Sequence, residues 1–457
     1  MAYNVLLRSF LLFLSSFILS FNFLEAQMVP AVFVFGDSLV DVGNNNYLKV
    51  SLAKADFPHN GIDFPTKKPT GRFTNGKNAA DFLAEKVGLP TSPPYLSLVS
   101  KSNKNNGSFL TGYAQSTAPN QNHSQYSQHN QYAQSTAPNQ QALNKPDVML
   151  HTCSSTLNSS SPALETLEPL PPSLPVTSSL VESNLVPVES PFSAASSTPQ
   201  SSLPSAPISQ SSLPSTSIPQ PPMRQSIPLT KQVDYYTTVF EDLKQQLGSS
   251  GAQNLLSKSL TAIVIGSNDI LGYFDSSDLR KQNTPQQFVD LMAATLKAQM
   301  KRIYNSGARK FVIAGTGAIG CCPSERNKNK TEECNEEVNH WSVKYNEGLK
   351  SMLQGLKSEL KDIKYSYFDT YSVLLSFIQN PTAYGFAEVK SACCGLGNLN
   401  AKVACLPIAK YCSNRRDHVF WDLYHPTEAA HRILVDDIFD GSSQYTFPMN
   451  VRQLIAV

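Results

Sequence analysis

Residues 31 to 39 read AVFVFGDSL, and this short stretch is the most informative part of the chain for its fold. Five consecutive apolar residues, rich in Val and Phe, predict a β-strand that is buried on both faces. Gly36 ends the run and permits a tight turn, so Ser38 is expected just beyond the carboxyl end of the strand. Ligands of open α/β sheets gather at this end of the strands.

Three further segments have the same form, and amphipathic helical patterns lie between them. The expected strands are Leu260 to Ile265, Lys310 to Ala314 and Ile363 to Phe368, and the expected helices are Ala79 to Val87, Val233 to Leu247, Pro285 to Asn305 and about Glu336 to Leu360. Buried strands that alternate with helices predict a three-layer α/β fold, in which helices flank both faces of a parallel sheet.

The composition is uneven along the 457 residues. Residues 113 to 222 contain 17 of the 31 prolines, no glycine and six charged side chains, and the sequence YAQSTAPNQ occurs there twice. Such a segment cannot bury enough apolar surface to offset the entropy cost of ordering it. We therefore expect one globular domain, formed by residues 27–112 and 223–457 and interrupted by a disordered Ser/Pro-rich insertion at 113–222.

The N-terminus has the pattern of a secretory signal peptide over residues 1–26. Arg8 precedes an apolar core from Phe10 to Leu19, and the apolar run as far as Leu24 is shorter than the roughly 20 residues that cross a bilayer. An uncleaved anchor or a buried N-terminal helix is the alternative.

With 37 Lys and Arg against 35 Asp and Glu, the net charge of +2 gives no reason to expect a nucleic-acid partner.

Cysteine usage agrees with secretion, because clusters of cysteines are usually bridged in an oxidising compartment. The eight cysteines are Cys153, Cys321, Cys322, Cys334, Cys393, Cys394, Cys405 and Cys412. Cys153 lies in the insertion and leaves seven in the domain, so at least one is free or pairs with Cys153 or with another chain. Adjacent cysteines lack the ligand spacing of a zinc site, so no metal is expected. Sequons at Asn106, Asn122, Asn158 and Asn329 are candidates for glycosylation.

A second group of reactive side chains lies near the C-terminus, where residues 422–426 read DLYHP. A carboxylate and an imidazole three residues apart at the start of a helix can face each other, so Asp422 could fix the tautomer of His425. The imidazole could then accept the proton of Ser38. Taken alone, these residues are more typical of a turn serine and a helix-capping aspartate.

Asn268 adds a third element, because the sequence GSND from Gly266 follows another predicted strand. Its amide should lie at the same sheet edge as Ser38, where it could donate a hydrogen bond to a developing oxyanion. The alternative is an Asx turn that closes the strand.

Several ordered motifs resemble the plant GDSL esterase/lipase family, within the SGNH hydrolase superfamily. They are FVFGDSLVDVGNNNYL (33–48), GIDFPTKKPTGRFTNGKNAADFLAE (61–85), IGSNDI (265–270), GARKFVIAGTGAIGCCP (307–323), ACCGLG (392–397) and FWDLYHPTEAA (420–430). The resemblance implies a flavodoxin-like SGNH hydrolase fold and a monomeric, secreted serine esterase or lipase that acts on small-molecule or lipid acyl esters without a cofactor. It assigns Ser38 as nucleophile, His425 as base, Asp422 as acid, and the Ser38 backbone N–H and the Asn268 side chain as oxyanion donors.

One block of the family pattern is missing. After a sequence like FLTG (109–112), family members carry a strand and glycine-rich turn resembling NFASGGSG, which supplies another oxyanion donor. Here Gly112 is followed by the low-complexity insertion, and the next glycine is Gly248. The alternative to an active esterase is therefore a catalytically impaired family member, at most ligand-binding, or the product of a transposon-disrupted gene or a mis-joined gene model.

Two other motifs have competing interpretations. Gly315 to Gly320 fits the dinucleotide pattern G-x-G-x-x-G, but a cofactor site also needs a helix that opens at the motif, and residues 326–330 read as a loop. We therefore expect no dinucleotide there. Thr70 to Gly76 resembles a structured loop, in which Arg72 is a candidate for substrate contact.

Overall fold

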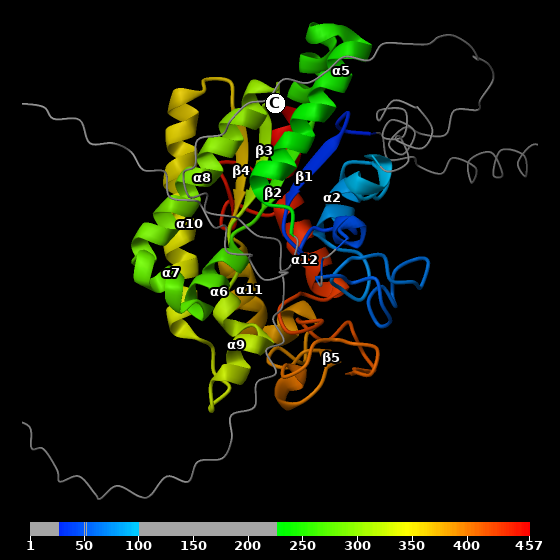
Figure 1. Ribbon diagram of the computed structural model, residues 1–457, viewed down its shortest axis with the longest axis vertical. Helices are drawn as coiled ribbons and strands as arrows, with labels where there is room; N and C mark the ends of the chain where they lie inside the picture. Colours follow the sequence, from blue (N-terminus) through cyan, green and yellow to red (C-terminus); the bar gives the residue numbers. More distant parts are fainter. Residues whose placement is uncertain (1–26, 50, 52, 100–225) are drawn as a thin grey trace, which may run out of the picture. The chain divides into compact units, whose positions relative to one another are not determined.

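A computed structural model describes residues 27–49, 51, 53–99 and 226–457 (Figure 1). The chain forms a five-stranded sheet in the order β1-β2-β3-β4-β7, with the first four strands parallel and the last antiparallel to β4. The strands are β1 (Val32–Gly36), β2 (Leu260–Val264), β3 (Lys310–Ala314), β4 (Lys364–Phe368) and β7 (Thr446–Phe447). The prediction of a largely parallel α/β sheet is confirmed.

The register of the four parallel strands determines where the chemistry can lie. Val32, Leu260 and Lys310 are paired in one row, and Gly36, Val264 and Ala314 are paired four residues later. All four strands therefore end at the same level. The residues that follow them, including those after Phe368, meet at a single edge of the sheet.

The fifth strand, β7, has no counterpart among the strands predicted from the sequence. This strand pairs Phe447 with Tyr367 and Thr446 with Phe368. A two-residue strand has no measurable alternation or apolar run, so periodicity could not have found it.

The helices agree with the predicted segments and add several short ones. They are α2 (Ala79–Lys86), α5 (Leu229–Lys258), α6 (Ser267–Asp275), α7 (Ser277–Gln282), α8 (Pro285–Asn305), α9 (Pro323–Lys328), α10 (Glu336–Glu359), α11 (Thr370–Gln379), α12 (Glu428–Asp440) and α13 (Val451–Ala456). Gly248, at a φ of 70°, interrupts α5 just after the predicted helix end at Leu247. The expectation of a loop at 326–330 was wrong in part, because α9 extends to Lys328.

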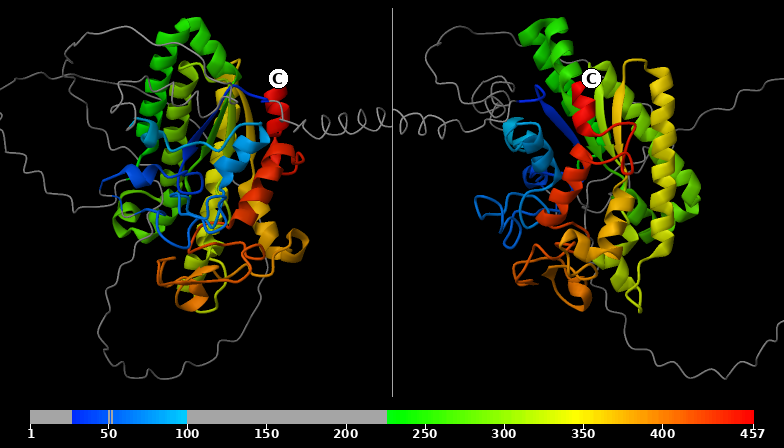
Figure 2. Two further views of the ribbon diagram at one scale, coloured as in Figure 1. Left: turned by 90° about the vertical axis from the view of Figure 1, so that its right-hand side faces the viewer. Right: turned by 180° about the vertical axis from the view of Figure 1, so that it is seen from behind.

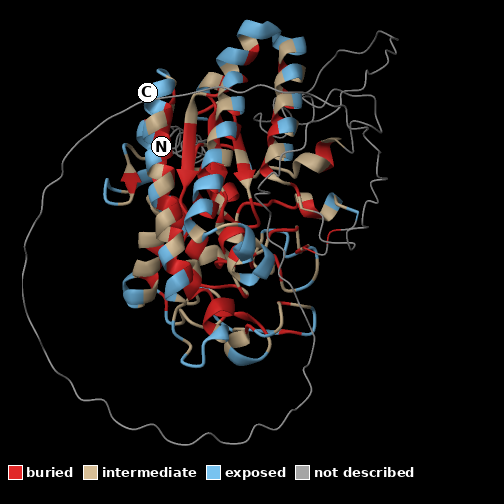
Figure 3. Cartoon of the chain, turned by 60° about the vertical axis from the view of Figure 1, so that its left-hand side comes forward, coloured by how far each residue is buried: buried red, intermediate tan, exposed pale blue. Residues whose placement is uncertain are grey.

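Alternate residues of the strands face two separate hydrophobic layers. Phe33, Phe35, Ile263, Phe311 and Ile313 pack against α5, α8 and α10. The residues between them pack against α2, α11, α12 and α13. Figure 2 shows these two helical layers on opposite sides of the strands, and Figure 3 shows the strands buried between helices with exposed outer faces. This two-sided burial explains why the strands are continuously apolar.

Three disulfides stabilise the loops beyond the carboxyl ends of the strands. They join Cys321 to Cys334, Cys393 to Cys412 and Cys394 to Cys405. The last two hold the small sheet formed by β5 (Cys394–Gly395) and β6 (Lys410–Tyr411). Cys322 is free and buried, in agreement with the expectation that seven cysteines leave at least one unbridged.

Two predictions, the signal peptide at 1–26 and the disordered insertion at 113–222, lie outside the described residues. Within the described part of the chain, no helix has the length and apolar character needed to cross a membrane.

A buried ion pair fixes the loop that contains Arg72. The Arg72 guanidinium donates to both carboxylate oxygens of Asp81 in α2, with Nε–Oδ2 and Nη2–Oδ1 distances of 2.6 and 2.7 Å. The side chains are 4% and 0% exposed, respectively, and a third hydrogen bond joins Arg72 to the Val42 carbonyl. Arg72 is therefore a structural residue that connects three segments, and the suggested substrate contact does not fit its burial.

We predict that Arg72→Met lowers the free energy of unfolding by about 3–5 kcal/mol, because it leaves the buried Asp81 carboxylate unpaired. Urea unfolding with the disulfides intact measures this loss. Lys281→Met is the matched control, since its ion pair with Asp278 is exposed and its removal should change stability little. Equal stability of the two variants would contradict the structural role of Arg72.

Candidate active site

Ser38 lies just after β1, at the edge where the parallel strands end. The turn that carries it needs glycine at position 36, because a Cβ there would lie 2.3 Å from the Val264 carbonyl oxygen and 2.6 Å from Val40 Cγ2. The Asp37 N–H then donates to the same Val264 carbonyl. This close approach of the two strands fixes the direction in which the chain delivers Ser38.

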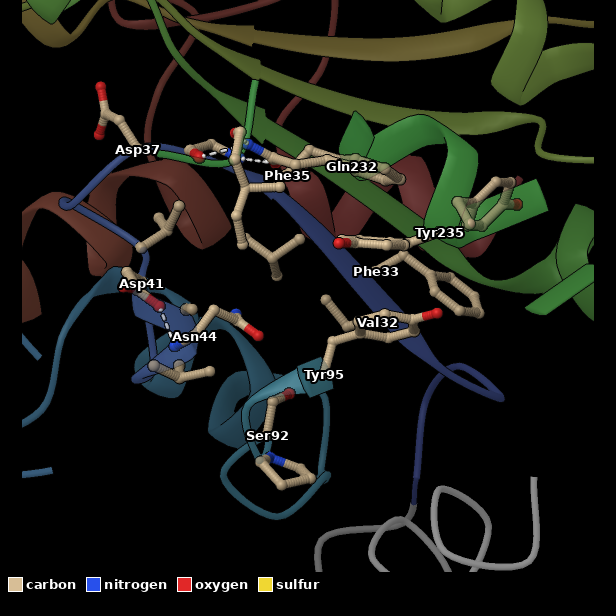
Figure 4. Close-up of a pocket in the computed structure, with 18 of the residues that line it drawn as sticks. Val32, Phe33, Phe35, Asp37, Asp41, Asn44, Ser92, Tyr95, Gln232 and Tyr235 are labelled. Atoms are coloured by element: carbon tan, nitrogen blue, oxygen red, sulfur yellow. Dashed lines mark hydrogen bonds between the residues drawn. The ribbon is translucent and has the colours of Figure 1, made fainter. Parts of the chain in front are cut away.

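The side chain of Gln232, in α5, holds the other side of this turn. Its Oε1 accepts from the Gly36 N–H at 2.9 Å and its Nε2 donates to the Gly36 carbonyl at 3.0 Å (Figure 4). Nε2 also donates to the Ile227 carbonyl at 2.9 Å. Sequence reasoning missed Gln232, because a glutamine in a helical pattern gives no signal of a contact 196 residues away.

Asp422 and His425 lie in a tight turn before α12, and the Trp421 N–H closes it by donating to the His425 carbonyl at 2.7 Å. Asp422 Oδ1 accepts the backbone N–H groups of Tyr424 and His425. His425 Nδ1 lies 2.7 and 2.8 Å from the two Asp422 oxygens, and Nε2 lies 2.7 Å from Ser38 Oγ. The structure therefore brings together all three residues that the sequence suggested.

The three side chains are well shielded from solvent. Ser38 and His425 are 3% and 4% exposed, and the Asp422 side chain is 13% exposed. The ring of Phe73 lies 5.1 Å from the His425 ring, centroid to centroid. A hydroxyl, an imidazole and a carboxylate in this order can move a proton from the hydroxyl to Nε2 while the carboxylate stabilises the imidazolium.

Asn268 is in the first turn of α6, which begins directly after β2. The preceding Gly266 has a φ of 123°, and a Cβ there would lie 2.6 Å from the ring of Tyr345. A residue other than glycine would therefore be strained and would clash at this position. Asn268 borders the same cavity as Ser38 and His425.

This cavity, which we call the Ser38 cavity, has a volume of about 90 Å³. Most of its lining is apolar and comes from the strand ends and from α11 and α12. The apolar residues include Val264, Leu271, Ala314, Ile319, Phe368, Leu374, Leu434 and Ile438. A small apolar space beside a serine hydroxyl suits the hydrocarbon part of a substrate.

A larger cavity of about 150 Å³ runs along β1, on the side of Tyr95 and Tyr235 (Figure 4). The rings of these tyrosines stack with centroids 4.8 Å apart. Neither Ser38 nor His425 lines this space, so its greater size does not make it the reaction site. Asp37 borders both cavities.

Asp37 is a buried carboxyl group immediately before Ser38. Its Oδ1 accepts the Leu39 N–H at 3.0 Å, and its Oδ2 has no hydrogen-bond partner among the described residues. Burial raises the pKa of Asp37 from 3.8 to about 6, although the Leu39 N–H and the nearby His425 oppose the rise. Above pH 6 the structure therefore holds an incompletely solvated anion beside the triad.

Packing explains the glycines of the 315–320 motif. A Cβ at Gly315 would lie 2.4 Å from the Tyr367 hydroxyl, and one at Gly320 would lie 2.1 Å from the Asn335 carbonyl. A single 3-10 turn, Ile319–Cys321, overlaps the end of the motif, and α9 begins later at Pro323. These glycines make room for the chain's own groups.

Within the described ranges, no cluster of three or more His, Cys, Asp or Glu residues is suited to holding a metal ion.

We predict that Asp37→Asn changes how stability depends on pH. Because burial raises the pKa of Asp37 in the folded state, the folded chain keeps the Asp37 proton between about pH 4 and pH 6, whereas the unfolded chain loses it. This proton stabilises the wild-type fold at low pH, and the stabilisation is lost as the pH rises through 6. The Asn side chain does not titrate in this range. The unfolding free energy of the variant minus that of wild type should therefore rise by about 3 kcal/mol between pH 4 and pH 7.5, since the pKa of Asp37 is raised by about two units.

Urea unfolding at both pH values measures this change, with the exposed Asp278→Asn as control. An unfolding free-energy difference between Asp37→Asn and wild type that stays constant from pH 4 to pH 7.5 would contradict the raised pKa.

Comparisons with known proteins identify the family to which this chain is similar. The family model described as GDSL-like Lipase/Acylhydrolase matches residues 32–161 and 210–438. GDSL esterase/lipase At5g55050 of Arabidopsis thaliana is 42% identical over 433 residues, which cover 94% of this chain and 90% of the relative. GDSL esterase/lipase At5g37690 of the same plant is 31% identical over 415 residues, covering 90% and 88%.

The family model spans the segments that carry Ser38, Asn268, Asp422 and His425. The expected SGNH fold class is confirmed by the family match together with the largely parallel sheet. The chain belongs to the GDSL esterase/lipase family, whose members are carboxylic ester hydrolases.

Proposed function

We propose that this chain hydrolyses carboxylic acyl esters through a covalent acyl-enzyme on Ser38. The observation that carries the proposal is the continuous hydrogen-bonded series from Asp422 through His425 to Ser38 Oγ, with both contacts to the imidazole at 2.7–2.8 Å. Membership of an esterase family supports the same reaction type.

In the first half of the reaction, Ser38 Oγ attacks the ester carbonyl while His425 Nε2 accepts its proton. Asp422 holds Nδ1 protonated, so Nε2 is free to act as the base. The Asp422 carboxylate also stabilises the imidazolium once it has formed. The Asp422 oxygens are well placed for this, because backbone N–H groups of the same turn hold Oδ1 in position.

The tetrahedral intermediate places a negative charge on the former carbonyl oxygen. In our proposal the Ser38 backbone N–H and the Asn268 amide donate to this oxyanion. His425 then protonates the leaving alcohol and afterwards activates a water molecule, which releases the acid and restores Ser38. The acyl group stays attached to Ser38 between these steps, so we assign the apolar Ser38 cavity to the acyl chain.

We also propose that the chain is secreted and monomeric, that residues 1–26 are a removed signal peptide, and that 27–112 and 223–457 together form the hydrolase domain. Three disulfides support an oxidising compartment. The physiological substrate would be a small-molecule or lipid ester.

A second candidate, a catalytically impaired esterase, is favoured by one observation. The sequence contains no glycine between Gly112 and Gly248, whereas the family pattern has a glycine-rich turn that donates to the oxyanion. An oxyanion hole with one donor fewer typically loses about 10² to 10³ in rate. Sequencing the transcript across codons 105 to 230 tests whether the insertion is present in the expressed protein.

We predict that Ser38→Ala abolishes turnover of p-nitrophenyl butyrate and that Asn268→Ala lowers kcat by about 10² to 10³, because it removes an oxyanion donor. Purified proteins with matched unfolding midpoints allow a direct comparison. Lys281→Met, far from the site on the exposed α7, is the control. Wild-type turnover no higher than that of Ser38→Ala would refute the esterase proposal.

We predict that replacing residues 113–222 with a block resembling NFASGGSG raises kcat by about 10² or more, because it restores a backbone oxyanion donor. The control is a block of equal length in which serine replaces each glycine. Both variants lack the insertion, so a higher kcat in the glycine version alone reports the effect of the oxyanion donor. No gain in kcat with the glycine version would show that this chain does not depend on the missing block.

A further inference from the structure

We infer that His431 makes the Ser38 cavity selective for acyl groups that carry a hydrogen-bonding oxygen, such as a hydroxyl or keto group. This inference rests on the proposed function and concerns its substrate class. It starts from α12, the helix that follows the turn bearing His425.

One face of α12 lines the cavity. His431, Leu434 and Ile438, at positions i, i+3 and i+7, all border it. The pattern of a buried amphipathic helix calls for an apolar residue at the first of these positions, and an imidazole is present instead. His431 borders the cavity and is 2% exposed, so its side chain has almost no contact with bulk water.

The imidazole of His431 lacks a complete set of hydrogen bonds. Its Nδ1 is buried and has no hydrogen-bond partner among the residues that the structure describes. Burial, and then the proximity of His425, lower the pKa of His431 from 6.5 to about 3. The ring is therefore neutral at physiological pH and can donate one hydrogen bond and accept one.

A second polar side chain of the cavity also has a buried atom without a hydrogen-bond partner among the described residues. Thr370, at the start of α11, borders the cavity, and its buried Oγ1 has no partner within the described part of the chain. Buried polar groups in native proteins are normally hydrogen-bonded, and leaving one unsatisfied is unfavourable. Two such groups in one mostly apolar cavity indicate a ligand that brings its own polar atom.

In the proposed reaction, the polar atom that His431 would contact lies on the acyl chain of the substrate. The ester carbonyl lies at Ser38 and Asn268, and in our proposal the acyl chain occupies the cavity beyond them. An oxygen on that chain can reach His431, whereas a plain alkyl chain leaves its nitrogen unsatisfied. Selection arises because the plain chain leaves the buried nitrogen without a hydrogen bond, which is unfavourable.

Three ethyl esters test this inference: pentanoate, 3-hydroxypentanoate and 4-oxopentanoate. We expect wild type to prefer at least one oxygenated ester over pentanoate in kcat/KM. His431→Leu should reduce that preference about fivefold, the size of one neutral hydrogen bond, and His431→Gln should retain part of it. Arg432→Gln, on the exposed face of the same helix and outside the cavity lining, should leave the ratio unchanged. Equal ratios in wild type and His431→Leu would overturn the inference.

Binding to the Ser38→Ala protein separates this inference from the proposed function. Ligand-detected NMR compares the affinities of pentanoate, 3-hydroxypentanoate and 4-oxopentanoate ions, and no turnover is needed. Tighter binding of an oxygenated acid that depends on His431 would support the inference even if the wild-type chain hydrolyses no ester. Equal affinities for all three acids would contradict it, and a preference that is lost only in Thr370→Val would assign the selectivity to Thr370 instead.

Discussion

The contact between Gly36 and the carbonyl of Val264 is the constraint on which the site depends. Two parallel strands end in register there, and the chain leaves β1 close enough to β2 that no side chain fits at position 36. The amide of Gln232 closes the opposite side through both backbone groups of Gly36. Ser38 is therefore delivered from a rigid turn, as a group that must be placed within a fraction of an ångström requires.

The turn that carries Asp422 and His425 is held in place by segments that lie far away in the sequence. Trp421 donates to Asn60, and Thr74 donates to the carbonyl of Pro426, so the loop of residues 60–76 holds both ends of the Asp422–His425 turn. The disulfide-bonded lobe contributes as well, because the N–H groups of Cys393 and Cys394 donate to the carbonyls of Phe420 and Trp421. The Arg72–Asp81 ion pair anchors the same loop to α2. Residues of three separate motifs thus position one imidazole.

The sequence predicted the parts of this arrangement that have a strong local pattern. The four parallel strands are continuous apolar runs, and the positions of Ser38 and Asn268 follow from the rule that strand ends meet at one edge. The pairing of Asp422 with His425 follows instead from their spacing of three residues before a helix. The contacts of Gln232 and the two-residue strand β7 could not be predicted, because neither has a periodicity. Arg72 was suggested as a substrate contact because it is a charged residue in a loop, and only the structure shows that Asp81 neutralises it in the interior. His431 was not singled out, since a histidine in an amphipathic helix looks like an ordinary core residue until its cavity is known.

The central claim is that Ser38 is an activated nucleophile, and covalent labelling tests it most directly. The full chain is incubated with an alkyl fluorophosphonate and digested, and the modified peptide is identified by mass spectrometry. Our account predicts a single stoichiometric adduct on Ser38, formed much more slowly in His425→Ala because the base that activates the hydroxyl is gone. Absence of an adduct at Ser38, or equal labelling rates in wild type and His425→Ala, would contradict it.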